Sequence, residues 1–211
     1  MNKDKNPFLK LVAMTIRGIL RIYDYICYRP KVIYTNKDVK KYIKKNPVIF
    51  VPNHFSYRDG PTCYFLFKNS SLIVARDWYE RKWIRLAVYG KPVIPIDRQG
   101  LDTAWLRDAS DMYKAGKHIF IFPEGHTNSF KEIDEFKAGF VMLSIMTGAP
   151  IVPMYIDGST EVFKGKRLKI YVGEVEELDS EGKGMNAQYL QKECKRFRQM
   201  VVDMREKYEK G

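Results

Sequence analysis

A histidine and an aspartate lie five residues apart, directly after an apolar and β-branched run. The run V-I-F-V (48–51) stops at Pro52, and the segment N-H-F-S-Y-R-D that follows carries His54 and Asp59. A neutral imidazole can accept a proton at neutral pH, and a carboxylate on its other ring nitrogen fixes the tautomer and stabilises the imidazolium. The chain has no G-x-S-x-G elbow and no cysteine beside the histidine, so the pair suits activation of a substrate hydroxyl. The competing interpretation is structural, with Asp59 only capping a helix that begins at D-G-P.

Further polar residues follow later apolar runs. Arg98 comes after V-I-P-I (93–96), and the turn P-E-G-H-T comes after H-I-F-I-F (118–122). Ligands of open α/β sheets bind beyond the carboxyl ends of the strands. We therefore expect these residues to converge with the histidine and aspartate at one edge of the sheet.

The two remaining histidines receive weaker interpretations. His118 opens an apolar run, which is typical of a structural position. His54, His118 and His126 lack the tight ligand spacing of a zinc site, so we expect no metal.

Six short apolar runs alternate with helical stretches. The runs are V-I-F-V (48–51), L-I-V-A (72–75), V-I-P-I (93–96), H-I-F-I-F (118–122), I-V-P-M-Y-I (151–156) and L-K-I-Y-V (168–172). The stretches 78–89 and 103–115 are amphipathic and precede Gly90 and Gly116, which suit helix C-caps; a closing helix is expected from about residue 186. This alternation predicts a single α/β domain with a largely parallel or mixed sheet flanked by helices.

The first quarter of the chain is strongly basic. Residues 1–45 hold twelve Lys or Arg against three Asp, a net charge of +9 out of +12 for the whole chain. Residues 6–28 form an amphipathic pattern with a wide apolar face and a narrow charged stripe of Lys10, Arg17, Arg21 and Asp24. Such a helix packs on its own domain or lies in a membrane interface, and the flanking cations favour the interface. We predict that residues 1–45 associate with an anionic membrane and that residues 46–211 form the catalytic domain. Because no nucleic-acid recognition module is recognisable, we expect no nucleic-acid partner.

Composition also bears on the compartment. The 211 residues contain no run of ~20 apolar residues and no apolar stretch that resembles a signal peptide near the start. Three widely spaced cysteines, Cys27, Cys63 and Cys194, favour a reducing environment. We expect a peripheral or monotopic protein on the cytoplasmic face of a membrane.

Four segments, taken in order, resemble one enzyme family. N-H-F-S-Y-R-D matches the N-H-x-S-x-x-D block of the lysophosphatidic acid acyltransferases, and V-I-P-I-D-R matches their second block, which ends in an arginine. F-P-E-G, followed downstream by F-K-A-G, matches the third block, and A-P-I-V-P-M matches the fourth. The chain is thus similar to this family over roughly residues 47–156, a stretch that includes the histidine and aspartate pair.

The resemblance implies a reaction and a set of roles. A fatty acyl group would move from acyl-CoA or acyl-carrier protein to the hydroxyl of a lysophospholipid, most directly 1-acyl-glycerol-3-phosphate, without a cofactor. His54 would act as the general base, Asp59 would orient it, and Arg98 would bind the acceptor phosphate. The full set of implied substrate-binding residues is Asn53, Ser56, Arg98, Glu124, Gly125, His126, Thr127 and Lys137.

One block departs from the family pattern. The third block usually continues as T-R-S, whereas this chain has His126, Thr127 and Asn128. Without the arginine, one charge-assisted contact to a phosphate is absent, worth ~1.5–3 kcal/mol unless Lys137 replaces it. The alternatives are therefore the same chemistry on another lysolipid acceptor, or a relative that binds lipid without catalysis.

Overall fold

The computed structural model describes residues 6–97, 103–128, 132–161, 165–179 and 184–209. Within these residues the chain forms one sheet in the order β1-β7-β6-β2-β5-β3-β4. The strands are β1 (Lys31–Tyr34), β2 (Ile49–Pro52), β3 (Ser70–Ala75), β4 (Val93–Ile96), β5 (His118–Phe120), β6 (Ile151–Asp157) and β7 (Lys169–Val172). The helices are α1 (Pro7–Cys27), α2 (Lys37–Lys45), α3 (Asp59–Leu66), α4 (Arg76–Tyr79), α5 (Lys82–Ala87), α6 (Ala104–Lys114), α7 (Gly139–Thr147) and α8 (Ala187–Glu209).

The sheet is mixed, as the alternation of strands and helices predicted. Strands β6, β2, β5, β3 and β4 run parallel to one another. Strand β7 pairs antiparallel with β6, and β1 pairs parallel with β7. All six apolar runs of the sequence are strands, so the prediction of an α/β fold is confirmed.

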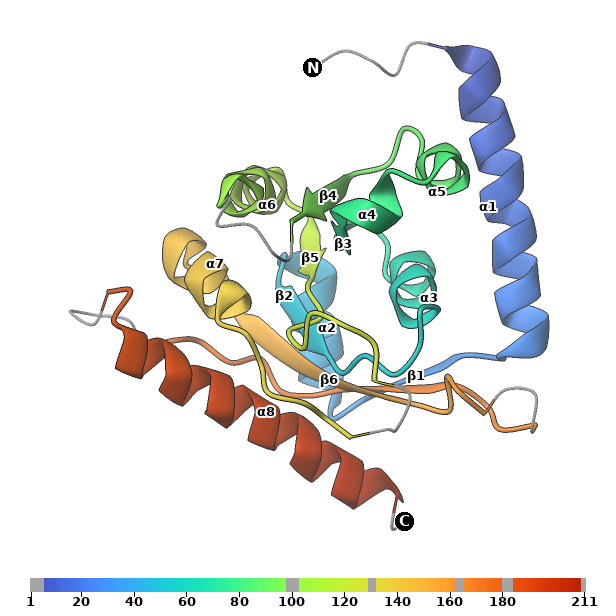
Figure 1. Ribbon diagram of the computed structural model, residues 1–211. Helices are drawn as coiled ribbons and strands as arrows, with labels where there is room; N and C mark the ends of the chain where they lie inside the picture. Colours follow the sequence, from blue (N-terminus) through green and yellow to red (C-terminus); the bar gives the residue numbers. More distant parts are fainter. Residues whose placement is uncertain (1–5, 98–102, 129–131, 162–164, 180–183, 210–211) are drawn as a thin grey trace.

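Helices cover both faces of the sheet, and each face has its own core (Figure 1). Alternate residues of β2 serve the two cores: Ile49 and Val51 pack towards α6, α7 and α8, whereas Phe50 packs towards α2 and α3. This alternation follows from the two-residue period of a strand. Because β2 is buried along its whole length, the loop at its end has a rigid base.

Two details differ from the sequence expectation. The stretch 78–89 is not one helix, because the backbone of Arg81, between α4 and α5, is extended. At this break Trp78 stacks on Tyr57 and meets Trp83 edge to face. The aromatic contacts thus accompany a bend that helical periodicity alone does not reveal.

The second difference concerns residues 31–45. These residues were grouped with the membrane-association segment, yet β1 is an edge strand of the sheet and Val39 and Ile43 of α2 are buried in the core. The folded unit therefore starts before residue 46. A role of the basic α2 at a membrane stays a prediction.

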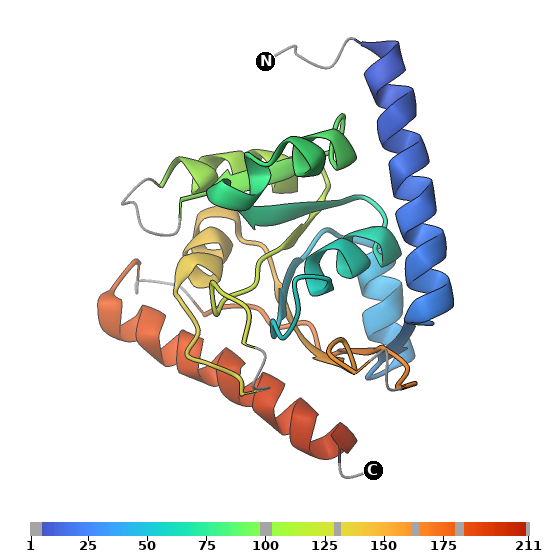
Figure 2. The same cartoon turned by 45° about the vertical axis from the view of Figure 1, so that its right-hand side comes forward.

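Helix α1 lies along one side of the molecule, next to α5 and α3 (Figures 1 and 2). Its charged stripe is turned towards the domain: Arg17 donates to the carbonyl oxygens of Ala87 and Tyr89, at 3.0 Å each. Many of its apolar side chains face outward: Phe8, Leu11, Met14, Ile19, Ile22, Tyr25 and Ile26 are 55–75% exposed. Ala13 is buried, however, and Tyr23 and Cys27 pack against the core. Among the described residues, none of the helices combines the length and apolar character needed to span a bilayer.

Candidate active site

The loop after the central strand β2 carries His54. The Nδ1 atom of His54 lies 3.2 Å from Oδ2 of Asp59, the first residue of α3. The Asp59 side chain is fully buried, whereas the His54 side chain is 17% exposed. The predicted pair is therefore formed at the carboxyl edge of the parallel strands, where such sheets bind ligands.

Asp59 organises the whole loop through one oxygen atom. Besides His54, Oδ2 accepts the backbone N–H groups of Phe55 at 2.9 Å and Ser56 at 2.7 Å. Since an ionised carboxylate only accepts hydrogen bonds, Nδ1 of His54 carries the proton in this arrangement and Nε2 keeps its lone pair. Nε2 has no hydrogen-bond partner within the described part of the chain, so it can accept a proton from a bound molecule.

The turn after β5 holds His54 from the other side. Oε1 of Glu124 accepts the backbone N–H of His54 at 2.7 Å, and the N–H of Asn128 donates to the carbonyl oxygen of His54 at 2.8 Å. The ring of Phe122 stacks on the imidazole, with 4.1 Å between ring centroids. Backbone and ring are thus both fixed, which is the preorganisation that proton transfer in a site requires.

Glu124 is almost completely buried at this junction, and its second oxygen accepts the N–H of Asp134 at 3.2 Å. Burial raises the pKa of Glu124 to about 7, although its bonds to the backbone N–H groups of Asp134 and His54 act to lower it. Folding therefore favours the protonated form. The stability from this group is present below its ordinary pKa of 4.5 and is lost as the pH rises through about 7.

His118 has the opposite effect on stability. Its Nδ1 accepts the N–H of Val48, and burial lowers its pKa from 6.5 to about 4, consistent with the structural role expected for it. Its contribution is present above pH 6.5 and is lost as the pH falls through about 4. The effects of Glu124 and His118 on the free energy of unfolding have opposite pH dependences between pH 4.5 and 6.5. A curve of wild-type stability against pH therefore does not separate them.

We expect Glu124→Gln to destabilise the protein most at low pH. The stability difference from wild type should shrink by ~2–3 kcal/mol between pH 4.5 and pH 8, because only the wild type titrates at this position. Urea unfolding at several pH values measures this difference, and the trend should persist in a His118→Asn background. A difference that does not change with pH would contradict a raised pKa.

His126 and Thr127, which replace the usual threonine and arginine, lie in different surroundings. Nε2 of His126 lies 2.9 Å from Oδ2 of Asp134, and Nδ1 lies 3.1 Å from the carbonyl oxygen of Glu124. Each ring nitrogen of His126 thus faces an oxygen acceptor of the protein. Thr127 is half-buried and makes no hydrogen bond with the described residues.

Lys137 packs against the turn after β5 that carries Glu124 and Gly125. Its N–H donates to the carbonyl oxygen of Pro123, and its side chain runs over Gly125, where an added Cβ would lie 2.9 Å from Nζ. Gly125 has a φ of +75°, so this position requires glycine for both its backbone angle and the close approach. The Lys137 ammonium is exposed and forms no ion pair among the residues described.

Of the other predicted site residues, two lie at the loop and one cannot be placed. Asn53 is fully buried, and its amide donates to the carbonyl oxygen of Ile156 and accepts the N–H of the same residue. Ser56 is half-buried; its hydroxyl accepts the N–H of Arg58 at 3.3 Å. Asn53 therefore ties β2 to β6, which is a supporting position. Arg98 lies outside the described residues.

Three further residues complete the site, and none of them was predicted from the sequence. Phe122 and Asn128 flank the P-E-G turn and contact the His54 ring and backbone. Asp134 joins them because its carboxylate accepts from both His126 and the Asn128 side chain, at 2.9 Å each. Phe122 belongs to the F-P-E-G block and could have been noted, whereas Asp134 has no local signal.

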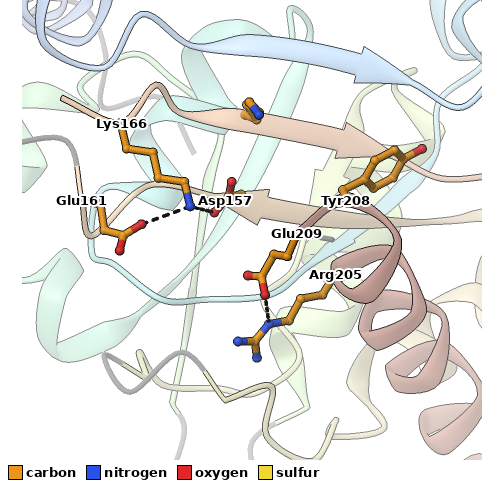
Figure 3. A pocket seen from close by; sticks show the side chains of 7 residues that line it. Asp157, Glu161, Lys166, Arg205, Tyr208 and Glu209 are labelled. Atoms are coloured by element: carbon orange, nitrogen blue, oxygen red, sulfur yellow. Dashed lines mark hydrogen bonds and ion pairs between the residues drawn. The ribbon is translucent and has the colours of Figure 1, made fainter. Parts of the chain in front are cut away.

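A separate pocket of about 440 Å³ lies where the end of β6 meets α8 (Figure 3). Its charged side chains pair with one another: Lys166 bridges Asp157 and Glu161, and Arg205 pairs with Glu209. The histidine and aspartate pair does not line this pocket. We therefore place the candidate site at the His54 loop.

Comparison with known proteins identifies related sequences and a related fold. A family model described as acyltransferase matches residues 31–157, more than half of the chain. The chain is 26% identical over 118 residues to a chloroplastic 1-acyl-sn-glycerol-3-phosphate acyltransferase of Brassica napus, covering 55% of this chain and 34% of that protein. It is also 26% identical over 123 residues to a 1-acyl-sn-glycerol-3-phosphate acyltransferase of Borreliella burgdorferi, covering 57% of this chain and 49% of that protein.

The alignments thus span a third to a half of the length of these curated relatives. Among solved structures, the 1-acyl-sn-glycerophosphate acyltransferase PlsC from Thermotoga maritima has a similar fold, with a TM-score of 0.58 at 20% identity. That match covers 96% of this chain and 84% of the other. The family resemblance drawn from the four sequence blocks is confirmed: the chain belongs to the acyltransferase family.

Proposed function

We propose that this protein transfers a fatty acyl group from an acyl thioester to the hydroxyl of a lysophospholipid. The observation that carries the proposal is the geometry of His54, whose Nδ1 is held by buried Asp59 while Nε2 is left open at the carboxyl edge of the sheet. The relatives named above are 1-acyl-sn-glycerol-3-phosphate acyltransferases, which makes 1-acyl-glycerol-3-phosphate the first acceptor to consider.

In the proposed reaction, Nε2 of His54 takes the proton of the acceptor hydroxyl as its oxygen attacks the thioester carbonyl. Asp59 stabilises the imidazolium that forms. The tetrahedral intermediate then breaks its C–S bond, and the leaving thiolate takes the proton from the imidazolium. The products are the acylated lipid and the free thiol of CoA or acyl-carrier protein. The step requires no protein nucleophile, and Cys63, next to Asp59 on α3, is buried with a pKa raised well above its usual value by that burial.

We assign recognition of the acceptor head group to the turn after β5. The ammonium of Lys137 is exposed, forms no ion pair with the described residues, and lies beside Gly125, two residues in sequence before the position where the family carries an arginine. Thr127 can add one neutral hydrogen bond. Arg98 is proposed as a second phosphate ligand on the strength of the sequence block alone.

The test is an acceptor panel, in which thiol release from acyl-CoA and from acyl-carrier protein is measured with purified protein and vesicles. Lysophosphatidic acid is compared with lysophosphatidylcholine and lysophosphatidylglycerol. Preference for lysophosphatidic acid that Lys137→Met removes would support the phosphate assignment. Preference for another acceptor would keep the chemistry and overturn the assignment of 1-acyl-glycerol-3-phosphate. Vesicle binding without release for any pair would favour a lipid-binding relative without catalysis.

We also propose that the outward apolar face of α1 lies in a membrane interface. Seven large apolar side chains of this face are more than half exposed, whereas Arg17, Arg21 and Asp24 of the charged stripe bond to the domain. Full burial of each Leu, Ile or Phe side chain is worth ~1.5–3 kcal/mol. Lysines near an anionic surface add ~1 kcal/mol each, and α2 alone carries Lys37, Lys40, Lys41, Lys44 and Lys45. The cytoplasmic face is the proposed location, because the three cysteines are free thiols.

Ile22→Asp should therefore weaken binding to anionic vesicles by at least ~tenfold, because it places a charge in the apolar face of α1. Met146→Asp is the matched control: Met146 is 46% exposed, but it lies on α7, on the opposite face of the sheet. Co-sedimentation with vesicles measures both variants. Equal binding of the two variants would contradict the assignment of α1 as the membrane contact.

A further inference from the structure

The last turn of α1 contacts the loop that carries the catalytic pair. The guanidinium of Arg58 contacts two aromatic rings of this turn and its cap, 4.8 Å from the ring centroid of Tyr23 and 5.2 Å from that of Tyr28, and these two rings meet edge to face. Tyr28 is almost fully buried, so one side of this arrangement is fixed in the core. A cation within about 6 Å of two aromatic rings is attracted by both.

A second contact joins the same two segments. The hydroxyl of Thr62 donates to Oδ2 of Asp24 at 3.2 Å, and Thr62 is almost fully buried in the first turn of α3. Asp24 lies in the sequence between the two tyrosines, and its carbonyl oxygen accepts the N–H of Tyr28. The end of α1 thus contacts the start of α3 at two points, residues 58 and 62.

Asp59 lies between these two anchor points. Its backbone N–H donates to the carbonyl oxygen of Ser56, and its carboxylate holds the N–H groups of Phe55 and Ser56 as well as Nδ1 of His54. A shift of the first turn of α3 would therefore move the carboxylate relative to the imidazole. A displacement of ~1 Å in a catalytic group can cost a large factor in rate.

We infer that Arg58 is a positioning residue that couples the position of α1 on the domain to the geometry of His54 and Asp59. The inference rests on the proposed function, because it concerns the same catalytic pair. Arg58 occupies one of the three variable positions of the N-H-x-S-x-x-D block, so the block itself does not require it. In this protein the element proposed to meet the membrane and the element that carries the aspartate are in direct contact.

The test compares Arg58→Ala with Arg58→Lys in the full chain. Arg58→Ala should lower kcat by ~fivefold or more while KM and vesicle binding change less than ~twofold, and Arg58→Lys should recover most of the loss. Lys207→Ala is the matched control, because its exposed ammonium lies 5.3 Å from the centroid of the Tyr208 ring on α8, which packs on the other face of the sheet from Tyr28 and α3. Should Arg58→Ala fail to fold, Tyr23→Leu replaces it, with Tyr23→Phe as the variant that keeps the ring.

A second readout does not depend on turnover. Amide hydrogen exchange of Phe55 and Ser56, whose N–H groups are held by Asp59, should accelerate in Arg58→Ala and stay unchanged in Lys207→Ala. Unchanged kcat and exchange in Arg58→Ala would overturn the inference, as would an equal loss in Lys207→Ala. Absence of acceptor-dependent thiol release in the wild type would overturn the proposed function instead, while the exchange experiment would still decide the coupling.

Discussion

His54→Ala is expected to lower kcat/KM by ~10²–10⁴, the usual contribution of a general base. The imidazole is the group with a free ring nitrogen at the carboxyl edge of the sheet, held by Asp59 on one side and by the Phe122 ring on its face. Alanine leaves the backbone N–H and carbonyl of residue 54 in place, so their bonds to Glu124 and Asn128 remain. We therefore expect lost turnover with an intact fold.

Steady-state kinetics and circular dichroism measure the two effects separately. His118→Asn is the histidine control, because His118 begins β5 at the opposite edge of the sheet from the His54 loop. Its loss should change stability and leave turnover near the wild-type rate. Retention of more than about a tenth of the activity in His54→Ala would contradict the assignment of the base.

Asp59→Asn is expected to lower kcat by a comparable factor, ~10²–10⁴, because the negative charge that stabilises the imidazolium is lost. Asparagine keeps one oxygen that can accept the N–H groups of Phe55 and Ser56, so the loop retains its shape. Asp59→Ala is less informative, because it leaves two backbone donors and His54 Nδ1 without their acceptor. Unpaired buried donors cost ~1–3 kcal/mol each, and the variant could lose activity by unfolding.

The two substitutions should not be additive. Once His54 is absent, the charge of Asp59 has no imidazolium to stabilise, so the double variant should be about as slow as His54→Ala alone. Kinetics of the single and double variants measured in parallel provide the comparison. Additive losses would show that the aspartate acts independently of the histidine. A kcat within ~threefold of wild type for Asp59→Asn would show that its charge is not needed for turnover.

The strands could be located from sequence because burial on both faces leaves a continuous apolar run. The run 48–51 corresponds to β2, and 151–156 corresponds to β6, with boundaries shifted by a residue. Strand β1 was missed since K-V-I-Y is short, half-exposed and set in a basic segment. The direction of β7 was also beyond local patterning, because antiparallel pairing with β6 depends on the turn that starts at Gly158, which has a φ of +86°.

The site was predicted where one short block contains its residues. His54 and Asp59 lie within a single loop and its following helix, so their contact follows from local geometry. The hydrogen bonds made by Glu124, Asn128 and Asp134, in contrast, join segments that only the sheet brings together. The orientation of α1 was likewise inaccessible, because amphipathic spacing defines two faces without saying which one meets the domain.

Thiol release measured as a function of both acceptor and His54 tests the central claim most directly. Purified wild-type protein and His54→Ala are incubated with palmitoyl-CoA or an acyl-carrier protein thioester on vesicles, with and without a lysophospholipid. The account predicts that release requires the lysophospholipid, yields the acylated lipid and disappears in His54→Ala. Release that is independent of the acceptor, or equal in both proteins, would contradict direct transfer with His54 as the base.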